Sequence, residues 1–523
     1  MGLCLRVLKE HDTDVQELRP SPHHQQNEAA NEEYILGESP IRGPPAPKQR
    51  NFQPSSLQSL AFEALRRYVC NFSLCLIQSV GNNFCKLDNA IHTCSHLQIM
   101  LHTMVPYNFA NEVTQNLLIS VDNIYKYIRV WAKEAWCKRI LEELVKAIIH
   151  PMLTKLDLHC TLHFLAGILF TRLNTMKNLK VLKLRQLIDR SYEPFIIDGL
   201  HIMVDLETFV LHYLCSDNII KAISTCKHLK ILDVAFSHYV SDACIEAILE
   251  LESLEELKVN DTSVSEQGYV KLLTGLNHNK KHSKRNNVLH KFGCSHIGAS
   301  HLNLLFSNFP NLVELSVHKY HYDNSCVIGL KNLQIARFSD CKFSDIRELL
   351  CTGVHLQTLE LDKIKDLNVK VIGEHCRSLQ DLTIRGYVRH IPQYGDDKVP
   401  LQGFQSLQSI TLNLYRDYSF IEYMLSVCTN LKVIDIFITD GSEQESDTLM
   451  EYVLSRNPLK CLEEFSIKTH MSGLLTLHTA KLLINACPHI TVLKGINTWS
   501  SIGILDDFVE EVTENYPHIH LGV

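Results

Sequence analysis

The stretch LQTLELDKIKDLNVKVIGEHCRSLQDLTI, residues 356–384, carries the same short pattern at both of its ends. Leu356 begins a Leu-x-x-Leu-x-Leu pattern, and Leu379 begins a Leu-x-x-Leu-x-Ile pattern 23 residues later. The alternation of apolar and other residues predicts a short strand with one buried face at each end. Residues 368–379, between the two patterns, have the apolar spacing of a helix. One unit of this chain is therefore predicted to be a strand followed by a helix.

Copies of this pattern recur along most of the chain. Neighbouring copies begin 21 to 31 residues apart, except for a gap of 58 residues between Leu254 and Leu312. NVLHKFGC, around Leu289, is a plausible worn copy inside that gap. The thirteen visible copies begin at Leu153, Leu179, Leu206, Leu229, Leu254, Leu312, Leu333, Leu356, Leu379, Leu407, Leu431, Leu462 and, in degenerate form, Ile490.

The period is that of a leucine-rich repeat. A single unit cannot bury its own apolar face, so neighbouring units must stack, with their strands paired in parallel and their helices on the convex side. We expect an α/β fold, a leucine-rich-repeat solenoid or horseshoe, over residues 151–523. The helix-ending cysteines and the form VSDACIEAIL (residues 240–249) resemble the cysteine-containing repeats of F-box proteins and related ubiquitin-ligase receptors.

The first 150 residues have a different character. Residues 1–53 are rich in proline, amides and charge, which predicts a disordered tail because too little apolar surface is present to offset the ordering entropy. Residues 54–150 have helical periodicity, with Ser55 and Gln58 spaced as a capping box and a break expected at Pro106. Near 277–287, NHNKKHSKRNN forms a basic polar insertion, which we interpret as a solvated loop, with a nuclear-import signal or a patch that binds an acidic partner as the alternative.

Composition excludes several classes of function. The chain has 523 residues and a formal net charge of −7, so general attraction to nucleic acid is not expected. No apolar run reaches the roughly 18 residues of a membrane span. The 18 cysteines contain no Cys-x-x-Cys pair, and Cys226, Cys376, Cys428 and Cys487 are expected to be buried free thiols in a reducing, cytoplasmic compartment, with nuclear entry left open. No nucleotide-binding loop, catalytic elbow or zinc spacing is present, so we expect no enzyme activity, no cofactor and no metal.

The outward-facing strand positions are expected to form a concave, protein-binding face. Their charges are of both signs and hydrogen-bonding groups are frequent, which suits a protein or peptide partner better than a phosphate backbone. The predicted target-binding residues are His212, Asp233, Asn260, His318, Arg337, Glu360, Arg385, Asn413 and Asp435. Outward positions also fall at His159, Lys183, Lys258, Ser316 and Lys468.

A narrow apolar seam lies just after the tail. In PSSLQSLAFEALRRYV, residues 54–69, Leu57, Ala61 and Leu65 are spaced by four, so that they share one side of a helix. With Ser56, these residues resemble the elongin C-binding BC box, (Ser/Thr)-Leu-x-x-x-(Cys/Ala)-x-x-x-aliphatic. Ala61 stands where cysteine is most frequent in that pattern.

A second stretch resembles a docking box of the same family. VPYNFANEV fits the cullin-two box, apolar-Pro-x-x-apolar-x-x-x-apolar, although Leu57 and Pro106 lie 49 residues apart, farther than is usual for the two boxes. Its matching residues are Val105, Pro106, Phe109 and Val113. The same residues also resemble, more loosely, the opening of an F-box, which docks Skp-type adaptors.

Together the boxes and repeats resemble the leucine-rich-repeat substrate receptors of elongin–cullin-two ubiquitin ligases. The resemblance implies a non-catalytic adaptor that binds elongin C with elongin B and a cullin through residues 55–115, and a target protein through its repeats. Two alternatives remain open. One is an F-box receptor of a Skp-type ligase, and the other is a stand-alone interaction scaffold whose residues 54–150 only cap the solenoid.

Overall fold

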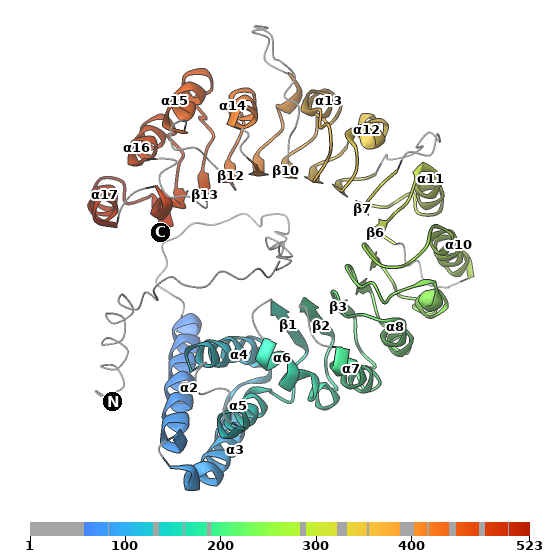
Figure 1. Cartoon of the computed structure of the whole chain (residues 1–523), viewed down its shortest axis with the longest axis vertical. Helices are drawn as coiled ribbons and strands as arrows, with labels where there is room; N and C mark the ends of the chain where they lie inside the picture. The colour runs from blue at the N-terminus through green and yellow to red at the C-terminus, as the bar shows by residue number, and fades with distance from the viewer. Residues whose placement is uncertain are drawn as a thin grey trace, which may run out of the picture. The chain divides into compact units, whose positions relative to one another are not determined.

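The computed structural model describes residues 57–81, 83–128, 135–159, 163–185, 190–282, 289–321, 332–352, 355–386, 402–415, 418–438, 446–469, 476–499 and 502–522 (Figure 1). The tail predicted for residues 1–53 lies outside these ranges. The chain divides into two compact units, Met1–His150 and Pro151–Val523, each with its own internal contacts.

The first unit is helical. Its α-helices pack in two pairs, α3 on α5 and α2 on α4, around a core that includes Val69, Ile77, Leu97, Leu117 and Leu141. Its elements are α2 (Leu57–Gly81), η1 (Phe84–Lys86), α3 (Leu87–Met104), η2 (Tyr107–Phe109), α4 (Ala110–Tyr127) and α5 (Ala135–Ile148).

The helix break expected at Pro106 is confirmed. Helix α3 ends at Met104, and Pro106 precedes the short turn η2 that leads into α4. In agreement with the helical periodicity of this region, Val113, Leu117, Val121 and Ile124 recur on one face of α4 and are buried. The N-cap expected at Ser55 lies outside the described residues, and the Gln58 amide instead donates to the carboxylate of Glu112 over 3.1 Å.

The second unit contains the repeats. Its fifteen strands form one sheet in which they follow one another in chain order, and every pair is parallel. The strands are β1 (Lys155–His159), β2 (Val181–Arg185), β3 (Thr208–Leu211), β4 (Ile231–Asp233), β5 (Glu256–Lys258), β6 (Lys291–Ser295), β7 (Glu314–His318), β8 (Ile335–Ser339), β9 (Thr358–Asp362), β10 (Asp381–Gly386), β11 (Ser409–Leu414), β12 (Val433–Ile438), β13 (Glu464–Thr469), β14 (Val492–Lys494) and β15 (His520–Gly522). This sheet confirms the predicted leucine-rich-repeat fold.

The sequence pattern predicted the first residue of each strand from β1 to β14. Each predicted strand begins two residues after the first apolar residue of its copy, and the worn copy at Leu289 forms β6. Strand β15 was not predicted. Its register pairs Val492 with His520, so His518 stands where the first leucine of the copy would be.

Helices and short turns connect the strands on the outer side of the sheet (Figure 1). They are α6 (His163–Phe170), η3 (Leu173–Thr175), η4 (Arg190–Tyr192), α7 (Glu193–Leu200), α8 (Asp217–Ile223), η5 (Asp242–Cys244), α9 (Ile245–Leu249), α10 (Glu266–His282), α11 (Ala299–Asn308), α12 (Phe343–Cys351), α13 (Val369–His375), η6 (Gln402–Phe404), α14 (Tyr418–Val427), α15 (Ser446–Arg456), α16 (Leu477–Ala486), η7 (Ile496–Thr498) and α17 (Ile502–Asn515).

The basic insertion near 277–287 is not a loop in its first half. Residues 277–282 are the last turns of α10, and the Asn277 amide donates to Asn308 over 2.9 Å. This contact ties the end of α10 to the end of α11, which explains why the helix continues. Residues 283–287 lie outside the described ranges.

Buried cysteine thiols donate hydrogen bonds to backbone carbonyls of the preceding repeat. Cys226, Cys376, Cys428 and Cys487 are free and buried, as predicted. The Cys226 thiol donates to the Met203 carbonyl of the preceding unit over 3.5 Å, and the Cys376 thiol donates to the Leu350 carbonyl over 3.7 Å. Burial raises the pKa of the Cys376 thiol to about 12, so the group stays a neutral donor.

The strands from β3 to β10 end in a shared backbone turn. Five residues after the first residue of each of these strands, one residue has a positive φ, a conformation that costs an ordinary residue about 1–2 kcal/mol. At Lys363, where φ is 51°, the backbone N–H donates to the Arg385 carbonyl of the next repeat over 2.7 Å. The residues of this row are Tyr213, Phe236, Asp261, His296, Lys319, Asp340, Lys363 and Gly386.

This turn predicts a position-specific effect of β-branched residues. We expect Lys363→Val to lower the free energy of unfolding by about 1–2 kcal/mol, because valine is strongly disfavoured at positive φ. Lys365→Val, two residues away where the backbone forms a parallel bridge with Lys342, should have little effect. Both side chains are exposed, so neither substitution removes buried contacts. The difference between the denaturant titrations of the two variants therefore measures the cost of the backbone conformation at residue 363. Equal losses of stability would contradict this explanation.

Candidate interaction surfaces

The seam predicted on α2 is at the surface of the first unit. Leu57 is 85% exposed, Ala61 is exposed and Leu65 is half-buried, while Ser56 lies outside the described residues. Leu60, on the adjoining side of the helix, is 55% exposed. Two large exposed leucines at the start of one helix form an apolar surface that the described residues of this unit leave uncovered.

The second predicted box is largely engaged by the unit itself. The Phe109 ring packs edge-on against Phe62 of α2 at 5.9 Å between centroids, and Val113 is 6% exposed. Val105 is half-buried and Pro106 is exposed. Of the four residues, therefore, Pro106 offers the most surface to a partner, and Phe109 joins α4 to α2.

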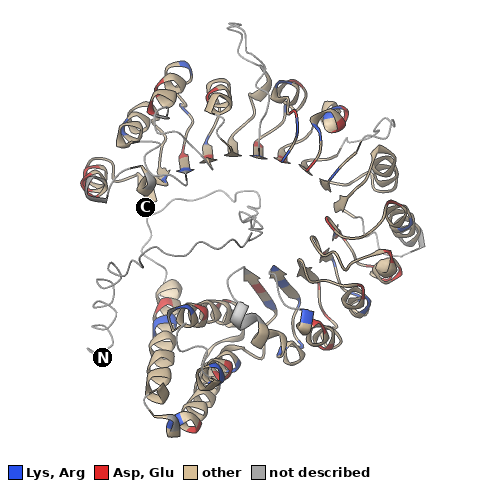
Figure 2. Ribbon diagram, viewed as in Figure 1, with Lys and Arg blue, Asp and Glu red and all other residues tan. Residues whose placement is uncertain are grey.

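On the repeat unit, alternate strand residues form rows across the concave face. One row runs in register through Lys258, Gly293, Ser316, Arg337 and Glu360. Charged side chains of both signs occur along these strands (Figure 2). Of the predicted target-binding residues, His212 and Asn260 are buried, Asp435 is exposed, and those that are half-buried are Asp233, His318, Arg337, Glu360, Arg385 and Asn413.

A charge cluster occupies the strands from β5 to β10. Glu314, whose side chain is 5% exposed, lies 3.3 Å from Lys258, 3.5 Å from Lys291 and in contact with Arg337. The Arg337 guanidinium also donates to Glu360 over 2.8 Å, and Glu360 lies 3.5 Å from Arg385. Each charged side chain in this cluster therefore lies within ion-pair distance of an opposite charge on a nearby strand.

Glu314 is held ionised by this cluster. Burial alone would raise the pKa of its carboxyl, but Lys258, Arg337 and Lys291 more than offset that effect and keep the pKa below its ordinary value. The pKa of Arg337 is raised in turn, because Glu360 and Glu314 outweigh its own burial. Both shifts favour the charged forms of Glu314 and Arg337.

Other predicted residues are also paired within the chain. His212 lies 3.1 Å from Asp233, and the Asn260 amide donates to Ser316 over 3.0 Å. The His318 ring nitrogen Nδ1 lies 2.8 Å from the Ser339 hydroxyl, and burial lowers the pKa of His318. These contacts connect strands of the sheet, so these side chains already have interaction partners within the protein.

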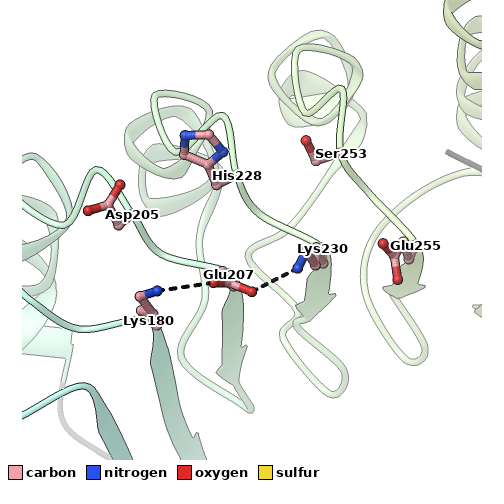
Figure 3. Close-up of a pocket in the computed structure, with 7 residues that line it drawn as sticks. All are labelled: Lys180, Asp205, Glu207, His228, Lys230, Ser253 and Glu255. Atoms are coloured by element: carbon pink, nitrogen blue, oxygen red, sulfur yellow. Dashed lines mark hydrogen bonds and ion pairs between the residues drawn. The ribbon is translucent and has the colours of Figure 1, made fainter. Parts of the chain in front are cut away.

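A further polar depression lies at the start of the strands from β2 to β5 (Figure 3). Glu207 is placed between Lys180, at 3.7 Å, and Lys230, at 2.8 Å, and these lysines lower the pKa of its carboxyl. Asp205, His228, Ser253 and Glu255 complete the lining. The sequence prediction missed this row, although its charges alternate in sign at the residue after each first leucine.

The described ranges contain neither a metal-binding group of side chains nor a membrane-spanning helix. Within those ranges, no three or more His, Cys, Asp or Glu side chains are grouped so that they could hold a metal ion. No helix in the same ranges has the length and apolarity needed to cross a membrane.

Solved structures with the same repeat architecture share little sequence with this chain. An internalin (InlF) of Listeria monocytogenes is 16% identical, with a TM-score of 0.28 over 73% of this chain and 94% of that chain. The TLR13 chain of a TLR13–ssRNA13 complex is 14% identical, with a TM-score of 0.28 over 72% of this chain and 65% of that chain. The functional domain of InlJ from Listeria monocytogenes is 14% identical, with a TM-score of 0.26 over 68% of this chain and 64% of that chain.

The match thus spans less than two thirds of the TLR13 and InlJ chains. No protein-family model and no curated protein sequence matches this chain. At such low TM-scores these likenesses carry no argument about function. The repeats themselves make this a leucine-rich-repeat protein, an architecture that implies protein–protein interaction.

The charge cluster predicts a large stability effect at Glu314. Glu314→Gln should lower the free energy of unfolding by about 3–5 kcal/mol, because Lys258, Lys291 and Arg337 would be left around a neutral group. Glu348→Gln, on the exposed side of α12, is the matched control and should change it by less than about 0.5 kcal/mol. Urea titrations of both variants measure the difference, and similar midpoints would refute the role of the cluster.

The same carboxyl predicts a pH dependence. Because the folded-state pKa of Glu314 is lowered, its contribution to stability is complete above its unfolded-state pKa, near 4.5, and is lost as the pH falls through the folded-state value. Thermal midpoints measured from pH 7 to pH 3 should fall less steeply in Glu314→Gln than in the wild type. Parallel curves for the two proteins would show that Glu314 does not contribute to the acid sensitivity.

Proposed function

We propose that this protein is a substrate-recognition adaptor of a cullin-RING ubiquitin ligase. Its repeat unit would bind a target protein, and the start of its helical unit would bind elongin C, in complex with elongin B, and through it a cullin. The adaptor performs no chemistry, because it only brings target lysines near a ubiquitin-loaded enzyme. The observation that carries the proposal is the exposure of Leu57 and Ala61 on one side of α2.

The seam has the physical properties that helix-in-groove docking requires. Leu57 projects into solvent, and the small Ala61 side chain, one turn on, would let a partner helix approach closely. Burying one leucine side chain contributes about 1.5–3 kcal/mol, enough to change an affinity by one to two orders of magnitude. Leu65, which is half-buried, would complete the seam at its inner end.

The Skp-type and stand-alone alternatives concern the same helices. The internal packing of Phe109 and Val113 favours a stand-alone scaffold, because residues used within the fold are not free for a cullin or a Skp-type adaptor. An adaptor that used elongin C would need only the α2 seam for its first contact. A substitution at Leu57 therefore distinguishes an elongin C adaptor from a stand-alone scaffold.

The test is recovery of purified elongin B–elongin C complex on the immobilised full chain. We expect the wild type to bind and Leu57→Glu to weaken binding at least about tenfold, because a charge would enter an apolar pocket. The matched control is Ile99→Glu, a change at a side chain that is 62% exposed on α3. Thermal midpoints should be unchanged in both variants, since neither side chain is buried.

Three results would count against the proposal. Absence of binding by the wild type would reject it, as would equal binding by Leu57→Glu. Recovery of a Skp-type adaptor in place of elongin C would favour the F-box alternative.

A further inference from the structure

Pairing between concave side chains is interrupted at β12 and resumes where Glu464 of β13 contacts Lys494 of β14. From β3 to β10 most outward charges lie in ion pairs or hydrogen bonds, as at Asp233, Glu314 and Glu360, with Asp362 as an exception among the described residues. On β12 and β13 the pattern changes. Asp435 and Lys468 are exposed, and within the described structure neither has a hydrogen bond or an ion pair.

The register places these two charges close to one another but not in contact. Asp435 pairs in register with Ser466, and Phe437 pairs with Lys468, so Lys468 lies one strand across and two residues along from Asp435. With strands about 4.8 Å apart and a rise of about 3.3 Å per residue, the two Cα atoms are roughly 8 Å apart. The half-buried Phe437 lies beside both of them in the sheet.

A buried hydroxyl in the same patch is also unsatisfied. Ser466 is 2% exposed, and its Oγ has no hydrogen-bond partner among the described residues. A buried polar group without a partner is unfavourable, so a ligand group that bonds to this hydroxyl is favoured. On the adjoining strand, Thr411 pairs in register with Asp435, and Asn413 pairs with Phe437. The side chains of Thr411 and Asn413 are half-buried and have no hydrogen-bond partner among the described residues either.

These observations distinguish the two parts of the concave face. A ligand at the Glu314 cluster would have to compete with ion pairs that the fold already makes, and an uncompensated buried charge is costly. At Asp435 and Lys468 a ligand of complementary charge displaces only water. Binding of a charged protein segment is therefore favoured over β11–β13.

We infer that β11–β13 bind an extended segment of a partner protein in which a basic and an acidic residue are two positions apart. Side chains at positions i and i+2 of an extended chain project to the same side, about 6.6 Å apart, and flexible charged side chains span the remaining distance to Asp435 and Lys468. The basic residue pairs with Asp435 and the acidic residue pairs with Lys468. This inference rests on the target-binding part of the proposed function and not on elongin C.

The experiment is selection of a random twelve-residue peptide library, displayed on phage, against the immobilised full chain. We expect enrichment of peptides with Arg or Lys two positions from Asp or Glu. The two binding-site variants should change that motif in opposite directions. Asp435→Lys should enrich two acidic residues at this spacing, and Lys468→Glu should enrich two basic residues.

Asp198→Lys, on the exposed surface of α7, is the matched control and should leave the selected motif unchanged. A synthetic peptide of the enriched sequence should lose at least tenfold in affinity on Asp435→Asn. The inference is overturned if no charge-paired motif is enriched, or if the motif is the same in all variants. Because the selection contains no elongin, failure of the elongin experiment would leave this result standing, and the reverse also holds.

Discussion

The burial of two apolar side chains per strand, in register from repeat to repeat, is the interaction on which this structure depends. In β9, for example, Leu359 and Leu361 point inward, and each lies beside its counterpart on β8 and β10. Neither residue could be buried by its own unit. Stacking therefore requires parallel pairing, and parallel pairing places every outward residue in a row with its equivalents in neighbouring repeats.

That arrangement has a direct consequence for the concave face. Residues more than twenty positions apart in the chain become neighbours about 4.8 Å apart, close enough for their charges to pair. Where opposite charges meet, as at Lys258, Glu314 and Arg337, they form a cluster that stabilises the sheet. Where they do not meet, as at Asp435, a charge remains available to a partner. The same stacking thus separates a structural region from a candidate binding region.

The helical unit is stabilised by packing between its helices and not by stacking of repeats. Its core residues share the faces of amphipathic helices, and its exposed apolar side chains include Leu57 and Leu60 at the start of α2 as well as Ile99, Met104 and Tyr107 farther along the unit. Single exposed leucines are common on protein surfaces, so an exposed leucine indicates a binding site only when its neighbours extend the apolar surface. Here the spacing with Ala61 gives a seam, and our proposal of elongin C as the partner rests on that seam.

The sequence by itself determined the repeat, the strand positions and the split between inward and outward residues, because the two-residue period of a strand is local. It even located β6 from a worn copy, and it failed only at β15, where His518 replaces the first leucine. Only the tertiary structure decided which outward residues are available. His212 and Asn260 were predicted to bind a target, yet both are buried and bonded to the next strands, whereas Asp435 is exposed. Pairing across strands depends on the identity of residues in the neighbouring repeats, which no local pattern can reveal.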